Sequence, residues 1–181
     1  MVTAKDFMRA FDQVSSEQLV TLLESWTNRT TFTRYIKRKM MPVVAGIVGC
    51  DIEIEYRRVD VVFTSLTPSK EVRLIDGKVV VAIEHENDAG PEARDGGSRK
   101  EVAKLRDFNA PLGVLVTYID DNRLGMLASF ATIMSTLPNG SDVSDRGELL
   151  VIFGPYGMKV PTTLRWQYFE YRDGGFLELS I

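Results

Sequence analysis

The stretch Val79-Val80-Val81-Ala82-Ile83-Glu84-His85-Glu86-Asn87-Asp88 decides the fold that we expect for this chain of 181 residues. Its apolar first half predicts a strand covered on both faces, because a half-buried strand would alternate apolar with polar residues. Side chains two apart on a strand share a face, which places Glu84 and Glu86 together and His85 on the other side. Two carboxylates at the end of a buried strand repel each other unless a cation lies between them. A divalent metal is the simplest such cation.

The composition, 44% hydrophobic and 26% charged, is that of an ordinary globular protein. Its length favours one domain over residues 1–181, large enough to fold without a disulfide or structural metal. The single cysteine, Cys50, excludes an internal disulfide and fits a reducing compartment. The sequence has neither a signal peptide nor an apolar run of about 20 residues, so we expect a cytoplasmic protein without a membrane partner.

A further acid, Asp60, stands among apolar residues in a strand-like segment, 51–65. A buried charge has a high desolvation cost unless it is paired or bound to a metal. The alternatives for Asp60 are therefore a metal ion and an ion pair with Arg57 or Arg58.

Asp76-Gly77 predicts a tight hairpin turn that leads into the strand beginning at Val79. Asp60 and the Glu84/Glu86 pair would then lie on strands of one antiparallel meander. We therefore expect the three carboxylates to converge in space.

Ser98 and Glu101 have the spacing of a capping box, which predicts that a helix begins there after a loop. Lys100 and Lys104 lie one turn apart on this helix. The apolar segment 112–119 predicts a second doubly buried strand. Because a helix connects the two buried strands, we expect them to be parallel.

The C-terminal part predicts a helix over 122–136 that covers the sheet, then a strand, and finally a closing β-hairpin around Asp173-Gly174-Gly175. The expected fold class is therefore α/β, with a mixed central sheet flanked by helices.

Five cations and no acid occur within eleven residues of a predicted helix near residue 34. A solvated helix face is one interpretation, and a surface that contacts nucleic-acid phosphates is the other. The predicted phosphate contacts are Arg34, Lys37 and Arg38, although the net charge of −3 argues against a protein that coats nucleic acid.

The order of elements resembles the common core of the PD-(D/E)xK nuclease superfamily, the restriction-endonuclease-like fold. The resemblance covers roughly residues 16–119, and 120–181 would complete the sheet. Asp60 matches the first acidic motif, and Glu84-His85-Glu86 matches the second in a Glu-x-Glu form that some restriction enzymes share. The chain departs from the family where Val59 replaces the usual proline and Glu86 the usual lysine.

The resemblance implies a Mg²⁺- or Mn²⁺-dependent nuclease that hydrolyses phosphodiester bonds in DNA, with a homodimer as a common assembly. Asp60 and Glu84 would hold the metal, helped by the main-chain carbonyl of His85, and Glu86 would bind a second ion or orient the attacking water. Lys100 or Lys104 would stabilise the scissile phosphate in place of the missing lysine. The His85 side chain is expected to pack rather than to act as a general base.

Two other functions stay open. The chain could be a catalytically inactive nuclease-like domain that binds nucleic acid or protein, or an unrelated α/β protein whose acids are merely ion-paired. The sequence does not decide between DNA and RNA.

Overall fold

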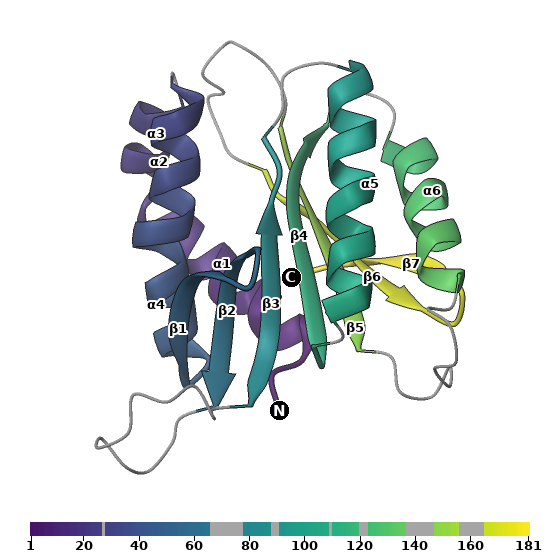
Figure 1. The fold of residues 1–181 in the computed structure, drawn as a ribbon. Coiled ribbons are helices and arrows are strands. Elements are labelled where there is room, and N and C mark those ends of the chain that lie inside the picture. Colours follow the sequence, from purple (N-terminus) through teal and green to yellow (C-terminus); the bar gives the residue numbers. More distant parts are fainter. Residues whose placement is uncertain are drawn as a thin grey trace.

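In the part of the chain that the structure describes, seven strands form one mixed sheet with helices on both faces (Figure 1). The computed structural model describes residues 1–26, 28–65, 78–87, 91–108, 110–119, 123–136, 147–155 and 165–181, and the side chains of all of these except 91–96 and 119. The general α/β class predicted from the sequence is therefore confirmed. The predicted turn at Asp76-Gly77 and the last acid of the opening stretch, Asp88, lie outside the described residues.

Helical segments occupy most of the chain before the first strand. They are α1 (Ala4–Glu17), α2 (Leu19–Ser25), α3 (Arg29–Tyr35), the π-helical turn η1 (Ile36–Met40) and α4 (Met41–Ile47). The strands and the helices between them follow as β1 (Cys50–Tyr56), β2 (Val59–Ser65), β3 (Val79–His85), α5 (Pro91–Phe108), β4 (Leu112–Ile119), α6 (Arg123–Ser135), β5 (Glu148–Pro155), β6 (Gln167–Arg172) and β7 (Gly175–Leu179).

The strands lie in the sheet in the order in which they occur in the chain. β1, β2 and β3 form an antiparallel meander, β3, β4 and β5 are parallel, and β5, β6 and β7 are antiparallel. The predicted parallel pairing of the two buried strands and the predicted C-terminal hairpin are both confirmed. Helix α5 is the crossover that parallel pairing requires.

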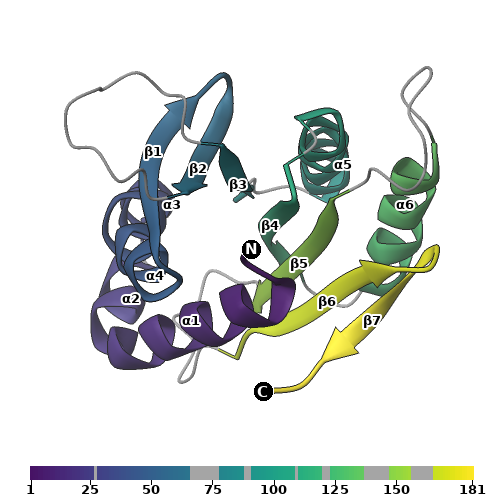
Figure 2. The ribbon, with the colours of Figure 1, turned by 90° about the horizontal axis from the view of Figure 1, so that it is seen from below.

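Two apolar layers cover the sheet, as the view from below shows (Figure 2). Helices α1 to α4 pack on one face, and α5 and α6 pack on the other. Within β3, Val81 and Ile83 face the first layer, whereas Ala82 faces the second. Strand alternation then carries the side chain of Glu84 to the α5 face and that of His85 to the α1–α4 face.

Helix α5 begins at Pro91, so the predicted helix start at Ser98 is wrong. Ser98 lies inside the helix, fully buried, with its Oγ 3.1 Å from Oγ1 of Thr117 in β4. A serine hydroxyl that bonds to a neighbouring strand is not available to cap its own helix, and proline is favoured in a first helical turn.

Within the described residues, no helix is long and apolar enough to cross a membrane.

Candidate functional site

Asp60 and Glu84 lie on neighbouring strands at adjoining positions. The antiparallel register pairs Val61 with Ile83, so the next residues outward are Asp60 and Glu84. The main-chain N–H of His85 donates a hydrogen bond to Oδ2 of Asp60 over 3.0 Å. Two of the three carboxylates predicted to converge are therefore held beside each other by the β2–β3 pairing.

Asp60 is ion-paired with Lys37, whose Nζ lies 2.6 Å from Oδ1. The alternative prediction, an ion pair of Asp60 with Arg57 or Arg58, is wrong, because both arginines lie in the exposed turn between β1 and β2. Lys37 belongs to η1, which packs with α1 to α4 on the face of the sheet opposite α5. Lys37 was also predicted to contact phosphate, and the structure places its side chain, which is 19% exposed, in this ion pair.

Glu84 is paired with Lys104 of α5, with Nζ 2.7 Å from Oε1. The same ammonium lies 2.6 Å from Oε2 of Glu101 and donates to the main-chain carbonyl of Arg58 over 2.8 Å. Of the two lysines predicted for this site, the structure therefore places Lys104 at Glu84, whereas Lys100 is exposed on the helix surface.

The pKa of the Glu84 carboxyl is shifted far from its ordinary value. Its side chain is 2% exposed, and burial together with the nearby charges of Asp60 and Glu101 raises its pKa to about 8, although the hydrogen bond from Lys104 acts in the opposite direction. Burial alone would lower the pKa of Lys104, but its bonds to Glu101 and Glu84 outweigh burial and raise it. A raised carboxyl pKa in a cluster of charges is a common property of functional sites.

Glu86 lies on the same face of the sheet as Glu84, but it lies beside a part of α5 that is nearer to the N-terminus of the helix. A β-carbon built on Gly97 would lie 2.9 Å from Oε2 of Glu86, so this glycine lets the carboxylate approach the helix backbone. The shared face predicted for Glu84 and Glu86 is confirmed. Across the described parts of the chain, however, no three His, Cys, Asp or Glu side chains are grouped so as to hold a metal ion.

The side chain of His85 lies on the opposite face of β3 from that of Glu84, as predicted. Its Nε2 lies 2.7 Å from the hydroxyl of Tyr118, and its ring contacts Phe32. Burial lowers the pKa of His85 to about 4, so the ring is neutral at pH 7. This environment indicates a packing role rather than that of a general base.

Replacing Tyr118 with phenylalanine tests this packing role. Among the described residues Nδ1 of His85 has no hydrogen-bond partner, so Tyr118→Phe would leave both ring nitrogens buried and unpaired. We expect the free energy of unfolding to fall by about 1–3 kcal/mol. Urea denaturation followed by tryptophan fluorescence measures this change, and an unchanged midpoint would contradict the packing role.

The remaining basic side chains of this region lie on α3 and η1. Arg34 is exposed, and Arg38 lies 3.7 Å from Glu55 with more than half of its side chain in solvent. The π-helical turn changes the direction of successive side chains, and such turns are frequent at functional sites. Arg34 and Arg38 therefore stay candidates for contact with phosphate.

Sequence reasoning missed Glu101 and the Arg58 carbonyl as partners of Lys104. Glu101 stands three residues before Lys104, and this spacing alone predicts a side-chain pair on a helix. No comparable pattern links Lys104 with Arg58, because their contact depends on how the β1–β2 hairpin packs on α5.

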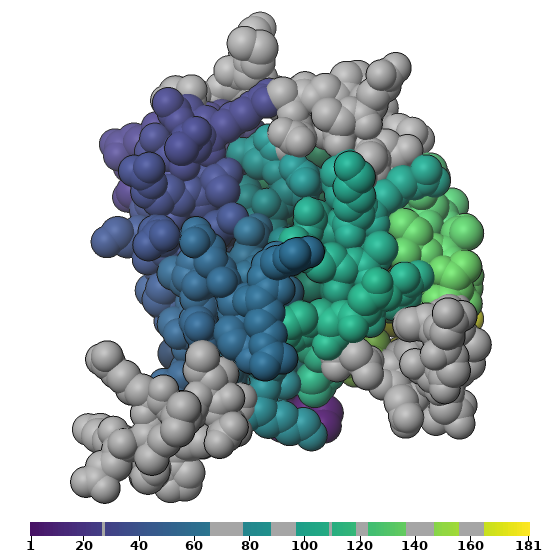
Figure 3. Space-filling model, viewed as in Figure 1, coloured from purple at the N-terminus to yellow at the C-terminus, as the bar shows by residue number. Residues whose placement is uncertain are grey.

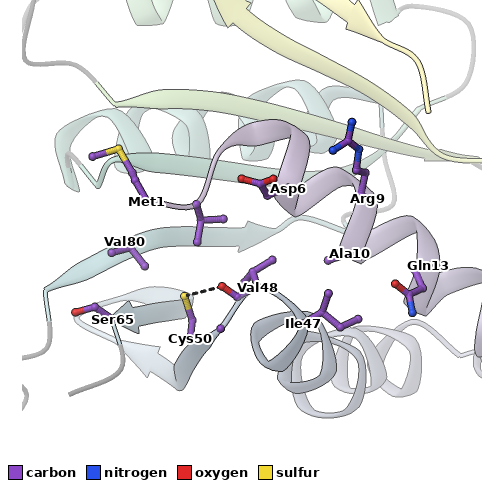
Figure 4. A pocket seen from close by; sticks show the side chains of 12 residues that line it. Met1, Asp6, Arg9, Ala10, Gln13, Ile47, Val48, Cys50, Ser65 and Val80 are labelled. Carbon is purple, nitrogen blue, oxygen red and sulfur yellow. Dashed lines mark hydrogen bonds between the residues drawn. The ribbon is translucent and has the colours of Figure 1, made fainter. Parts of the chain in front are cut away.

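A cavity of about 520 Å³ lies near the beginning of β3, away from the carboxylates (Figure 4). It is bordered by α1, the end of α4 and the start of β1. The carboxylate of Asp6, which borders the cavity, already accepts hydrogen bonds from the main-chain N–H and the hydroxyl of Thr3. The cavity contains none of the predicted site residues.

Comparisons with models of protein families, with curated proteins and with solved structures find no match.

Proposed function

We propose that this protein is a metal-dependent nuclease that hydrolyses phosphodiester bonds in DNA. The observation that carries the proposal is the adjacency of Asp60 and Glu84, each of which lies beside the ammonium group of a lysine from a different element. Positive and negative groups that meet at the end of two central strands are suited to bind a phosphate and to hold the cation that activates it.

The order of elements supports the same proposal. Helices precede an antiparallel β1–β2–β3 meander, and α5 then leads to β4, which is parallel to β3. This order agrees with the restriction-endonuclease-like core that the sequence resembles, and we propose that core as the finer description of the fold.

The two carboxylates suit a hard divalent cation. Mg²⁺ prefers oxygen ligands and retains several waters, so Asp60, Glu84 and the main-chain carbonyl of His85 would suffice to hold it. Asp60 is 22% exposed, which leaves a route for an ion to reach the pair. A bound Mg²⁺ would neutralise charge on the phosphate and make a water molecule more acidic.

The other side chains would then position the substrate. The ammonium groups of Lys37 and Lys104, placed beside the same two carboxylates, would contact the scissile phosphate and stabilise its developing charge. Glu86 would orient the attacking water or bind a second ion.

The proposal is tested by incubating plasmid, linear and branched DNA with the protein in Mg²⁺, Mn²⁺ or EDTA. We expect cleavage with either metal and none with EDTA. Cleavage that persists in EDTA would contradict metal dependence.

A second candidate function is binding of nucleic acid or protein without cleavage. It is favoured by the three oxygen partners of Lys104, which saturate the ammonium that catalysis would need. Stoichiometric Mn²⁺ binding without cleavage of any substrate would support it, whereas calorimetry without a Mn²⁺ signal would favour acids that are only ion-paired.

Metal binding should depend steeply on pH, because a carboxyl must lose its proton to bind a cation. The pKa of Glu84 is raised to about 8, so the protonated form dominates below this pH. We expect the Mn²⁺ affinity to rise about tenfold per pH unit from about pH 6 to pH 8 and then to level off. Titration calorimetry across this range measures the slope, and an affinity independent of pH would exclude Glu84 as a ligand.

A further inference from the structure

The turn between β1 and β2 holds its backbone in a conformation that its residues disfavour. Arg57 and Arg58 have φ values of 46° and 73°, and Glu55 just before the turn has a φ of 63°. Tyr56 pairs with Val59, so the two arginines are the central residues of a two-residue hairpin. Positive φ at both central positions is what a type I′ turn requires, and Asn-Gly or Asp-Gly normally supplies it.

The other two-residue hairpin of the described chain uses the favoured residues. In the β6–β7 turn, Asp173 and Gly174 have φ values of 52° and 85°, and Arg172 pairs with Gly175. The same backbone geometry is therefore built from Asp-Gly at one end of the sheet and from two arginines at the other. Two arginines make this turn conformation less favourable than Asp-Gly would, so the local backbone preference does not explain why arginines occupy the turn.

The arginine turn is fixed beside the carboxylate site. Lys104, the partner of Glu84, donates to the carbonyl of Arg58. The guanidinium of Arg57 lies 5.3 Å from the ring centre of Tyr56, which packs edge-on against Phe108 of α5. The space-filling view shows the blue β1–β2 segment against the teal α5 on one face of the molecule (Figure 3). These contacts hold the tip of the hairpin in a defined place.

We propose that Arg57 and Arg58 contact two phosphates of duplex DNA bound over the carboxylate site, an inference that rests on the proposed nuclease function. Both side chains are exposed, and neither forms an ion pair with a described carboxylate. The planar guanidinium fork matches phosphate oxygens in a two-point contact. Arg34 and Arg38 on α3 and η1 would supply positive charge on the other side of Asp60.

The test replaces the turn with the sequence that its backbone favours, Arg57→Asn with Arg58→Gly. Removal of the strain should raise the melting temperature by several degrees. Loss of two phosphate contacts should weaken binding of duplex DNA in EDTA by about tenfold or more. The slope of log affinity against log salt should become less steep by about 1.8, at 0.9 per phosphate.

The control variant, Arg57→Lys with Arg58→Lys, retains both charges and should retain the salt slope. If the wild type binds and cleaves DNA but the Asn-Gly variant binds with an unchanged slope, the inference is overturned and the proposed function stands. A lower melting temperature of the Asn-Gly variant would also overturn it, since the arginines would then serve the fold. A wild type without affinity for DNA would overturn both, and tighter binding of RNA would overturn the choice of duplex DNA.

Discussion

Asp60→Asn and Glu84→Gln should each lower metal-dependent cleavage of DNA by about a thousandfold or more. Loss of a charged metal ligand removes several kcal/mol of transition-state stabilisation, and each 1.4 kcal/mol corresponds to a tenfold change in rate. Initial rates of plasmid cleavage at saturating Mg²⁺, compared with the wild type, measure the effect.

Both substitutions keep the shape of the side chain, so the fold should persist. In Asp60→Asn the amide oxygen can still accept the hydrogen bond from the main-chain N–H of His85. In Glu84→Gln the ammonium of Lys104 keeps Glu101 and the carbonyl of Arg58. A normal melting temperature would therefore separate loss of chemistry from loss of structure.

The matched control is Glu178→Gln, an exposed carboxylate on β7 at the far edge of the sheet. It removes the same charge without touching the site, and its cleavage rate should equal that of the wild type. Retention of activity in both Asp60→Asn and Glu84→Gln would refute the site assignment.

Lys104→Met should destabilise the protein by about 3 kcal/mol or more at high pH. The substitution keeps the length of the side chain but removes the ammonium that neutralises Glu84, and removing one partner of a buried ion pair leaves an uncompensated charge. Urea denaturation at several pH values measures the loss.

The pH dependence of this loss has a definite sign. The pKa of Glu84 is raised in the folded protein to about 8 from the 4.5 of an ordinary glutamate. A carboxyl whose pKa is higher in the folded than in the unfolded protein stabilises the fold at pH values below its unfolded pKa. This stabilisation is lost as the pH rises through the pKa of the folded protein. Lys104→Met raises the pKa of Glu84 further, so its destabilisation should be small near pH 5 and largest above about pH 8.

Two control variants separate the contribution of the Glu84–Lys104 ion pair from other effects of the substitution. Lys100→Met removes an exposed lysine one turn away and should change the free energy of unfolding by less than about 0.5 kcal/mol. Adding Glu84→Gln to Lys104→Met should restore most of the lost stability, because no buried charge then lacks a partner. Equal losses in the single and double variants would show that Lys104 acts through packing alone.

Local patterns were sufficient to predict most of the fold. The apolar run in β3 and the second run in β4 predict buried strands, and the intervening helical segment predicts their parallel pairing, which the structure confirms. Alternation along β3 likewise places Glu84 and His85 on opposite faces. The start of α5 could not be predicted in this way, because Ser98 bonds to Thr117 of another strand rather than to its own helix.

The sequence by itself therefore determined that Asp60 and Glu84 stand on strands of one antiparallel meander and that Glu84 and His85 lie on opposite faces, since strand periodicity is a local property. Only the tertiary structure decided the partners of those carboxylates, Lys37 for Asp60 and Lys104 for Glu84. These pairs join residues far apart in the chain, and they form because helix packing brings the ammonium groups to buried acids whose desolvation cost then requires a cation. The same packing sets the β1–β2 turn against α5 and so gives the arginine pair its place beside the site.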